Sequence, residues 1–273
     1  MKILVTGHKG FIGQNLTNYI NDKTDWEVDG FEWGDKAIDF DYDWIIHLGA
    51  ISSTTERNVD KIMDQNYEFS VWLAKECDYR KINLQYASSA SVYGLNTSFN
   101  EDAPKDPKSP YAWTKYLFDR WIENQNFRRI TVQGFRYFNV YGEHEEHKED
   151  MASPVSKFTK QAIEEKKITL FRSSWQYERD FVWVGDVCKL HVKFIKDVNE
   201  NGIWNIGTGK TVSFEAIAKK IAKKYKAEIR EIPMPQNIRA QCQEYTCADL
   251  TKIKEHIGDY QWKNVLTWIN STS

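Results

Sequence analysis

The chain has 273 residues, which suits one large or two small domains, and its 41% hydrophobic and 28% charged residues are ordinary for a globular protein. This composition excludes a disulfide-rich miniprotein, a collagen-like chain and a disordered chain. The 37 Lys and Arg against 39 Asp and Glu leave a net charge of −2, so no overall positive field predicts a nucleic-acid or membrane partner.

The first residues of the chain and its cysteines indicate the cellular location of the protein. MKILVTG enters a strand-like run without a signal-peptide pattern, and no stretch of about 18 apolar residues follows. The four cysteines include no Cys-x-x-Cys pair. We therefore expect reduced thiols, no zinc and a cytoplasmic location. His144 and His147 lie in a charged loop, but their spacing lacks the His-x-x-x-His geometry of zinc enzymes, so we expect no metal there either.

Short runs rich in Val and Ile alternate with longer segments of helical periodicity through the first half of the chain. Strands are expected at Lys2–Thr6, Trp26–Phe31, Asp43–Leu48, Ile82–Ser88 and Arg129–Arg136. Helices are expected from about Phe11, Glu56 and Pro110, the last with Ser109 as its N-cap. The alternation predicts an α/β fold, a Rossmann-type doubly wound parallel sheet covered by helices.

Beyond Gly142 the chain changes to a charged loop, EHEEHKED, then a helix from about Ala152 and short strands near Thr169–Phe171 and Ile203–Ile206. A later segment, AIAKKIAKKYK, has one apolar face, which favours an ordinary surface helix over a membrane-surface one. No Pro, Gly or Ser-rich linker separates the halves. We predict an NAD(P)-binding domain over 1–142 with part of 175–210, and a smaller α/β substrate-binding lobe over 143–174 and 211–273.

A glycine-rich loop follows the first expected strand. Gly7, Gly10 and Gly13 stand at three-residue spacing in TGHKGFIG and lead into a helix. Such glycines permit a tight turn and a close approach of the backbone to a pyrophosphate, whose charge the helix N-terminus favours. This position between a strand and a helix predicts dinucleotide binding.

The second expected strand ends at Glu32, where a carboxylate can accept hydrogen bonds from the adenosine ribose. Its charge would repel the extra phosphate of NADP, which favours NAD. About ten residues separate Glu32 from the third strand, barely enough for a parallel crossover. We therefore expect the usual helix there to be trimmed or absent.

The segment SPYAWTKYLFDRW carries Tyr111 and Lys115 on one face of a helix, one turn apart. A nearby ammonium would lower the pKa of the Tyr111 phenol and make it a usable proton acceptor beside a hydride-transfer site. Ser89 follows an expected strand, at the edge of a parallel sheet where ligand chemistry takes place. These three residues are our candidates for catalysis.

Four motifs, TGHKGFIG, YASSASVYG, YAWTK and FRYFNVYG, together resemble the extended short-chain dehydrogenase/reductase superfamily of nucleotide-sugar epimerases and dehydratases, over nearly the whole chain. Within it, the segments SSTTE, NVYGEHEEHKEDMAS, RDFVWVGDV and YTCADL are similar to the ADP-L-glycero-D-manno-heptose 6-epimerases. The resemblance implies a tightly bound NAD or NADP, an ADP-sugar substrate and a homo-oligomer. Its reaction removes hydride from the sixth carbon of the heptose and returns it to the opposite face, giving a precursor of surface polysaccharide.

The resemblance also implies roles for individual residues. Tyr111 and Lys148 would handle the protons of the two epimers, Ser89 would orient the oxygen, and Lys115 would hold the nicotinamide ribose. The cofactor-binding residues it implies are Gly7, Gly10, Phe11, Ile12, Gly13, Glu32, Leu48, Gly49, Ala50, Ser52, Asn66, Lys115 and Val140. The substrate-binding residues it implies are Ser89, Asn139, Lys148, Lys157, Phe171, Arg172, Ser173, Ser174, Arg179 and Cys242.

The chain also departs from this family. It is shorter between the second and third strands, where basic residues that favour NADP are missing, so NAD and NADP both stay open. Lys157 stands where the family usually has histidine, and Cys242 where it has tyrosine.

Two other functions compete with an epimerase. A dehydratase needs an acidic pair just after the catalytic hydroxyl residue, and Ala90 and Ser91 stand there, which counts against water loss. A catalytically silent dinucleotide-binding scaffold would not need Tyr111, Lys115 and Ser89 together.

Overall fold

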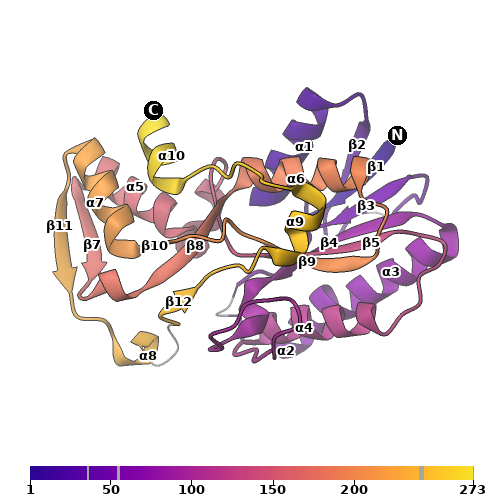
Figure 1. Cartoon of the computed structure of the whole chain (residues 1–273), viewed down its shortest axis with the longest axis horizontal. Coiled ribbons are helices and arrows are strands. Elements are labelled where there is room, and N and C mark those ends of the chain that lie inside the picture. The colour runs from indigo at the N-terminus through magenta and orange to yellow at the C-terminus, as the bar shows by residue number, and fades with distance from the viewer. Residues whose placement is uncertain (36, 54–55, 240–242, 273) are drawn as a thin grey trace.

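A computed structural model describes residues 1–35, 37–53, 56–239 and 243–272. Its largest layer is a parallel sheet of six strands in the order β2-β1-β3-β4-β5-β9 (Figure 1). The strands are β1 (Lys2–Thr6), β2 (Glu27–Phe31), β3 (Trp44–His47), β4 (Asn83–Ser89), β5 (Val132–Tyr137) and β9 (Gly202–Ile206). The chain adds strands on one side of β1 and then on the other, and this reversal opens a crevice at the carboxyl ends of β1 and β3.

Helices cover both faces of this sheet because side chains alternate along each strand. Ile3 and Val5 of β1 pack into one core with the first helix, whereas Leu4 packs into the core on the opposite face. One face carries α1 (Phe11–Lys23) and α6 (Val184–Asp197), and the other carries α3 (Phe69–Arg80) and α4 (Pro110–Glu123). The predicted Rossmann-type doubly wound sheet is confirmed.

The connection between β2 and β3 contains no helix in its described residues, 32–35 and 37–43. The expectation of a trimmed crossover is therefore confirmed for that part of the chain. Phe40 of this connection packs below the Arg80 guanidinium, whose central carbon lies 4.6 Å from the ring centroid. That contact fastens the short connection to the end of α3.

A continuous helical segment follows β3. It comprises α2 (Val59–Ile62), a π-helical turn (Met63–Glu68) and α3. It begins at Asn58, whose side chain accepts a hydrogen bond from the Lys61 backbone N–H at 3.0 Å, somewhat later than the expected start near Glu56. The π-helical turn, which the sequence pattern did not predict, contains the buried Asn66.

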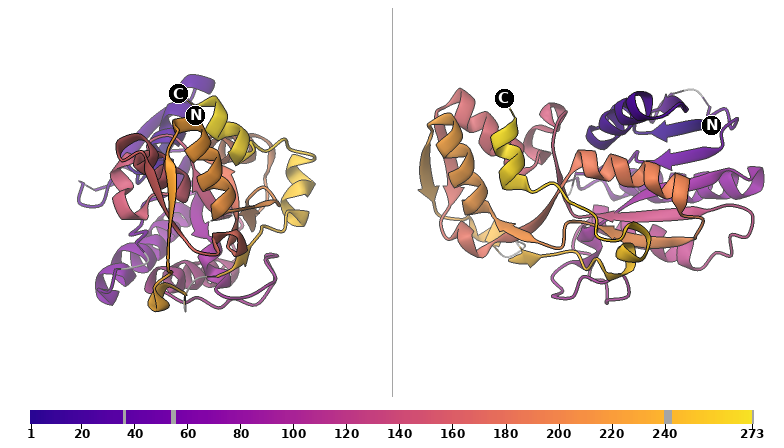
Figure 2. Two further views of the ribbon diagram at one scale, coloured as in Figure 1. Left: turned by 90° about the vertical axis from the view of Figure 1, so that its left-hand side faces the viewer. Right: turned by 45° about the horizontal axis from the view of Figure 1, so that its top comes forward.

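A smaller lobe lies at the far end of the molecule (Figure 2). It contains β7 (Lys167–Phe171) paired in parallel with β11 (Glu228–Ile232), together with α5 (Pro154–Glu164), α7 (Phe214–Tyr225) and α10 (Val265–Ser271). Ile217 and Ile221 of α7 enter its core with Ile168 of β7. The lysines of α7 therefore lie away from this core, as expected for a surface helix.

A second sheet runs between the two lobes. Its central strand, β8 (Glu178–Trp183), pairs with β6 (Asn139–Tyr141), β10 (Thr211–Ser213) and β12 (Tyr245–Thr246). The other α-helices are α8 (Gln236–Arg239) and α9 (Thr251–Ile257), and short 3₁₀ helices cover Ala90–Tyr93, Glu146–Met151 and Ser174–Gln176. The proposed division into two lobes stays a prediction. The range assigned to the smaller lobe includes α9, yet Ile253 of α9 packs into the same core as Trp204 of β9. Among the described residues, no helix combines the length and apolarity needed to cross a membrane.

Candidate active site

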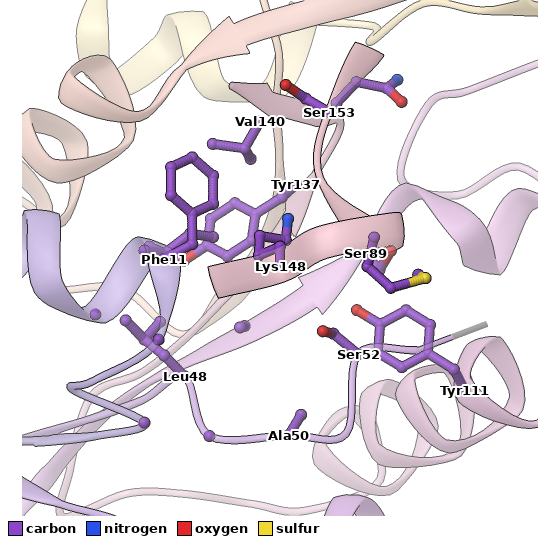
Figure 3. Close-up of a pocket in the computed structure, with 18 of the residues that line it drawn as sticks. Phe11, Leu48, Ala50, Ser52, Ser89, Tyr111, Tyr137, Val140, Lys148 and Ser153 are labelled. Carbon is purple, nitrogen blue, oxygen red and sulfur yellow. The ribbon is translucent and has the colours of Figure 1, made fainter. Parts of the chain in front are cut away.

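A cavity of about 590 Å³ opens at the carboxyl ends of the central strands, within the range of roughly 300–1,000 Å³ common for small-ligand pockets. Its walls come from the glycine loop, the segment after β3, the ends of β4 and β5, the start of α4 and the loop after β6 (Figure 3). It lies where the order of the strands reverses, as the doubly wound fold predicts.

The glycine loop forms a cradle that needs glycine at positions 7 and 13. A Cβ on Gly13 would lie 2.1 Å from the Gly7 carbonyl oxygen, and a Cβ on Gly7, whose φ is +72°, would lie 2.6 Å from the Gly49 nitrogen. No side chain caps the N-terminus of α1, and Phe11 and Ile12 line the cavity there. This close, uncapped backbone fits the pyrophosphate of a dinucleotide.

Glu32 lies at the edge of the same cavity. Its Oε1 accepts a hydrogen bond from the Lys9 backbone N–H at 2.6 Å and lies 3.3 Å from His8 Nδ1. The carboxylate thus braces the glycine loop, while its position beyond β2 is the one expected for a contact with the adenosine ribose.

Asn66 does not line the cavity, unlike the other residues expected to bind the cofactor. It is buried beneath the wall, where its side chain accepts from the Ile51 N–H at 2.8 Å and donates to the Ile51 carbonyl at 3.0 Å. His47 is tied to Thr6 Oγ1 at 2.7 Å and to Ser70 Oγ at 2.8 Å. These polar contacts hold the Gly49–Ile51 segment against the glycine loop, so Asn66 shapes the site indirectly.

Ser89 and Tyr111 meet on one side of the cavity. Ser89 ends β4, and Tyr111 lies in the first turn of α4, which Ser109 caps by accepting from the Ala112 N–H at 3.2 Å. Ser52, Ser89 and Tyr111 all line this part of the cavity (Figure 3), and the Ser89 side chain is close enough to influence the pKa of Tyr111. A substrate hydroxyl could be held between them.

The electrostatics of Tyr111 and Lys115 differ from the expectation. Burial raises the pKa of Tyr111, and the hydrogen bond from Ser89 opposes that rise. Lys115 Nζ donates to the Ala87 carbonyl at 2.8 Å and lies 5.9 Å from the centroid of the Tyr111 ring. Burial lowers the pKa of Lys115 to about 8, against the attraction of Asp119. The pKa of Tyr111 was expected to be lowered, and in the protein chain alone it is raised instead, because burial is the strongest influence on it.

Lys148 reaches the cavity from the loop between β6 and α5. Its Nζ lies 4.9 Å from the centroid of the Phe11 ring, and in the view of Figure 3 it falls between Phe11 and Ser89. Burial lowers the pKa of Lys148, and the charge of Glu145 opposes this. Two groups able to exchange protons, Tyr111 and Lys148, thus line one cavity from different elements.

The residues expected to bind substrate divide into three sets. Asn139 lines the cavity together with Ser89 and Lys148. Lys157 on α5, the turn from Phe171 to Ser174 after β7, and Arg179 on β8 lie outside its lining. Cys242 lies outside the described residues.

Arg179 already has backbone partners. Its guanidinium donates to the carbonyls of Glu178 at 2.9 Å, Glu244 at 3.2 Å and Gln243. It also lies 5.3 Å from the centroid of the Phe214 ring. Arg179 therefore fastens the segment before β12 to β8, and its contact with a substrate stays a prediction.

Several lining residues were missed from the sequence. They are Ala87, Ser88, Tyr137, Phe138, Met151, Ala152, Ser153 and Pro154. Ser88 and Tyr137 stand at the ends of β4 and β5, so the rule that places ligands at the carboxyl ends of strands could have found them. Among the described residues, no group of three or more His, Cys, Asp or Glu gathers that could hold a metal ion.

The fold and this cavity define a nicotinamide-dependent enzyme built on a doubly wound sheet. Residues 3–207 match the NAD dependent epimerase/dehydratase family, and the chain belongs to that family. The resemblance drawn from the motifs is thereby confirmed at the level of the family.

Solved structures of sugar-nucleotide epimerases share the fold along nearly the whole chain. ADP-L-glycero-D-manno-heptose-6-epimerase of Helicobacter pylori is 25% identical, with a TM-score of 0.85 over 99% of this chain and 96% of that one. UDP-N-acetylglucosamine 4-epimerase of Methanobrevibacter ruminantium is 18% identical, with a TM-score of 0.84 over 99% and 98%. UDP-glucose 4-epimerase of Thermotoga maritima is 23% identical, with a TM-score of 0.81 over 97% and 94%. The last two similarities concern the fold alone.

Proposed function

We propose that this enzyme interconverts ADP-D-glycero-D-manno-heptose and ADP-L-glycero-D-manno-heptose by oxidation and reduction at the sixth carbon. The observation that carries the proposal is the pair of proton-exchanging side chains, Tyr111 and Lys148, lining one cavity beside the glycine cradle. An epimerase that returns hydride to the opposite face benefits from two such groups, because the hydroxyl of each epimer points in a different direction. The 25% identity to the Helicobacter pylori enzyme supports the choice of sugar.

A bound nicotinamide cofactor would accept the hydride from the sixth carbon and give it back. Tyr111, as its phenolate, takes the hydroxyl proton of one epimer while the C–H electron pair leaves as hydride, which produces a ketone. Ser89 holds the oxygen through its hydroxyl, and the buried Lys115 ammonium stabilises negative charge nearby. After the ketone has rotated and its other face has been reduced, the Lys148 ammonium would protonate the new alkoxide. The reverse direction exchanges the two roles.

The nucleotide part of the substrate would extend from this cavity toward the smaller lobe. Asn139 would contact it at the cavity wall, and we assign Lys157, Phe171, Arg172, Ser173, Ser174, Arg179 and Cys242 to the same task. The guanidinium of Arg179 suits a pyrophosphate oxygen, provided that it exchanges some of its carbonyl partners for the substrate.

The cofactor is proposed to be NAD, on the strength of Glu32 at the cavity edge. A second phosphate on the ribose would meet this carboxylate, which already accepts the Lys9 N–H. Mass spectrometry of the cofactor released by denaturation tests this choice. NAD is expected, whereas NADP alone would overturn the role given to Glu32. We place the enzyme in the cytoplasm as a homo-oligomer that supplies a precursor of lipopolysaccharide.

A dehydratase remains the main alternative within the family. Elimination of water needs an acid and a base beside the reacting carbons, and Ala90 and Ser91 follow Ser89 where such groups would be required. This favours epimerisation. A silent scaffold is disfavoured because Ser89, Tyr111 and Lys115 line one cavity together.

The proposal is tested by giving each epimer separately to the wild type and to the variants Tyr111→Phe and Lys148→Ala. Proton NMR should show interconversion by the wild type and a loss of roughly 10²–10⁴-fold in each variant. Lys160→Ala, which changes an exposed lysine of α5, is the control and should keep full activity. A cofactor-loaded wild type without interconversion would refute the function, and an active Lys148→Ala would refute the mechanism with two groups.

A further inference from the structure

The loop that carries Lys148 contains a carboxylate that is almost completely buried. Glu145 is 2% exposed, although the charged residues around it predict a loop that faces solvent. A buried carboxylate without partners would be costly, so its contacts indicate what it does. Three hydrogen-bond donors surround it, and all of them belong to the two ends of this loop.

These contacts close the loop on itself. Glu145 Oε1 accepts from the Gly142 N–H at 3.1 Å and from the Ser153 hydroxyl at 2.8 Å, while Oε2 accepts from the Ser153 N–H at 2.6 Å. Ser153 is the N-cap of α5, since its hydroxyl also accepts from the Ser156 N–H at 3.2 Å. The carboxylate charge therefore lies at the positive end of a helix.

Lys148 is attached to this junction through its backbone. Its N–H donates to the Glu145 carbonyl at 2.9 Å, which closes a tight turn directly before the lysine side chain. The neighbouring Glu143 fixes the loop from outside, because its carbonyl accepts from Asn15 of α1 at 2.8 Å and its carboxylate accepts from Trp183 Nε1 at 3.0 Å. The loop is thus fastened to the cofactor-binding helix and to β8.

From this geometry we propose that Glu145 is a positioning residue for the reaction, which holds the Lys148 ammonium above Phe11 at the mouth of the cofactor cradle. The inference rests on the proposed function, because it gives Lys148 a role in proton transfer. Glu145 itself does not line the cavity, so it acts on the reaction through Lys148, by holding the loop and by its charge.

Glutamine has the size of glutamate but cannot replace it here. All three neighbours of the carboxylate donate, so the amide NH₂ of Glu145→Gln would face at least one backbone N–H in either orientation. The loop must then shift to relieve that contact, and a displacement near 1 Å is enough to lower a rate by about a hundredfold. Removal of the charge also removes its support for the protonated form of Lys148.

The test compares the wild type with Glu145→Gln, Ser153→Ala and the control Glu146→Gln, which removes an equal charge from an exposed neighbour in the same loop. In Glu145→Gln, kcat for epimerisation should fall by about a hundredfold while KM stays within about twofold. Ser153→Ala, which keeps the carboxylate, should lose less, and Glu146→Gln should match the wild type. Thermal melting checks that each variant is folded.

A second readout does not depend on activity. Acetic anhydride in trace amounts labels each lysine at a rate set by its free-amine fraction and its access, and mass spectrometry resolves Lys148 from the others. Labelling of Lys148 should rise several-fold in Glu145→Gln and stay unchanged in Glu146→Gln.

If Glu145→Gln keeps both wild-type labelling of Lys148 and wild-type kcat, the inference is overturned. If the wild type does not epimerise but the labelling changes as expected, only the proposed function fails. Should Glu145→Gln not fold, unchanged labelling and kcat in a folded Ser153→Ala would equally overturn the inference.

Discussion

At the scale of single residues, the ionisation of the proposed catalytic groups depends on burial. Tyr111 needs to lose a proton, and burial raises its pKa, whereas Lys115 needs to keep one, and burial lowers its pKa to about 8. Without a cofactor, burial therefore disfavours both the Tyr111 phenolate and the Lys115 ammonium. A charged cofactor would reverse part of this opposition, which makes proton transfer depend on cofactor binding.

The buried charge of Lys115 has a cost in stability that a substitution should reveal. Its folded pKa of about 8 lies below the ordinary lysine value of 10.5, so the unfolded chain holds this proton more tightly. The cost is fully present below pH 8 and is relieved as the pH rises from 8 to 10.5. Lys115→Met should therefore raise the free energy of unfolding of the cofactor-free protein at pH 7 by about 2 kcal/mol, while activity is lost.

Chemical denaturation of the cofactor-free protein measures this effect. Lys75→Met, at an exposed position on α3, is the control and should change the free energy of unfolding by less than about 0.5 kcal/mol. A Lys115→Met variant that is less stable than the wild type would show that the hydrogen bond to Ala87 outweighs the burial of the charge.

At the scale of elements, the turn between β1 and α1 leaves no room for a side chain at Gly13. A Cβ there would meet the Gly7 oxygen at 2.1 Å, so Gly13→Ala must push α1 away from the turn. We expect a loss of about 1–3 kcal/mol in the free energy of unfolding and a purified protein largely free of cofactor.

The control for this prediction is Gly34→Ala. A Cβ at Gly34 meets nothing within 4 Å, although φ is +96°. This variant should lose stability through backbone strain alone, by about 1 kcal/mol, and keep its cofactor. Absorbance and mass spectrometry measure the cofactor content of both purified variants, which tests whether cofactor binding needs glycine at position 13. Full cofactor content in Gly13→Ala would contradict the cradle.

The elements that the sequence predicted well carry local signals. The first strand was expected at Lys2–Thr6, where β1 lies, and the helix after Ser109 begins at Pro110 as its cap requires. The π-helical turn around Asn66 could not be predicted, because no residue type or spacing distinguishes such a turn from an ordinary α-helix. The burial of Glu145 could not be predicted either, because a run of charged residues normally faces solvent. Only the folded chain places the Ser153 N–H against its carboxylate.

At the scale of the whole molecule, most of the residues predicted to bind the cofactor line the cavity. Most of those predicted to bind the substrate do not. Local motifs such as the glycine loop carry their geometry with them, so Gly7, Gly10 and Gly13 came together as expected. Lys157 and Arg179 belong to elements of the smaller lobe and of the sheet beside it. Their distance from a ligand depends on how those parts pack, which no local pattern encodes.

The response of the whole fold to acid should depend on two buried histidines. His47 and His191 are fully enclosed, and burial lowers the pKa of each to about 3. His191 accepts from the Tyr137 hydroxyl at 2.5 Å and has Gln85 Oε1 2.6 Å from its other nitrogen, so it is held neutral. A depressed pKa means that their contribution to stability is complete above the unfolded value near 6.5 and is lost as the pH falls toward 3.

Each of the two histidines should remove about 3 kcal/mol of stability between pH 6.5 and pH 4. His191→Gln should therefore show a clearly weaker dependence of the free energy of unfolding on pH in this window, even though the change of side chain lowers its stability at pH 7. His144→Gln, at an exposed position, should keep the wild-type slope. Urea titrations at several pH values measure the slopes, and an unaltered slope in His191→Gln would contradict the account.

The central claim is that hydride leaves one carbon of a sugar nucleotide and returns to the same carbon on the other face, without exchange with water. The most direct test is proton NMR of one ADP-mannoheptose epimer incubated with the cofactor-loaded enzyme in D₂O. We predict that the second epimer accumulates with its hydrogen at the sixth carbon retained. Deuterium at that carbon, or no second epimer at all, would contradict the account.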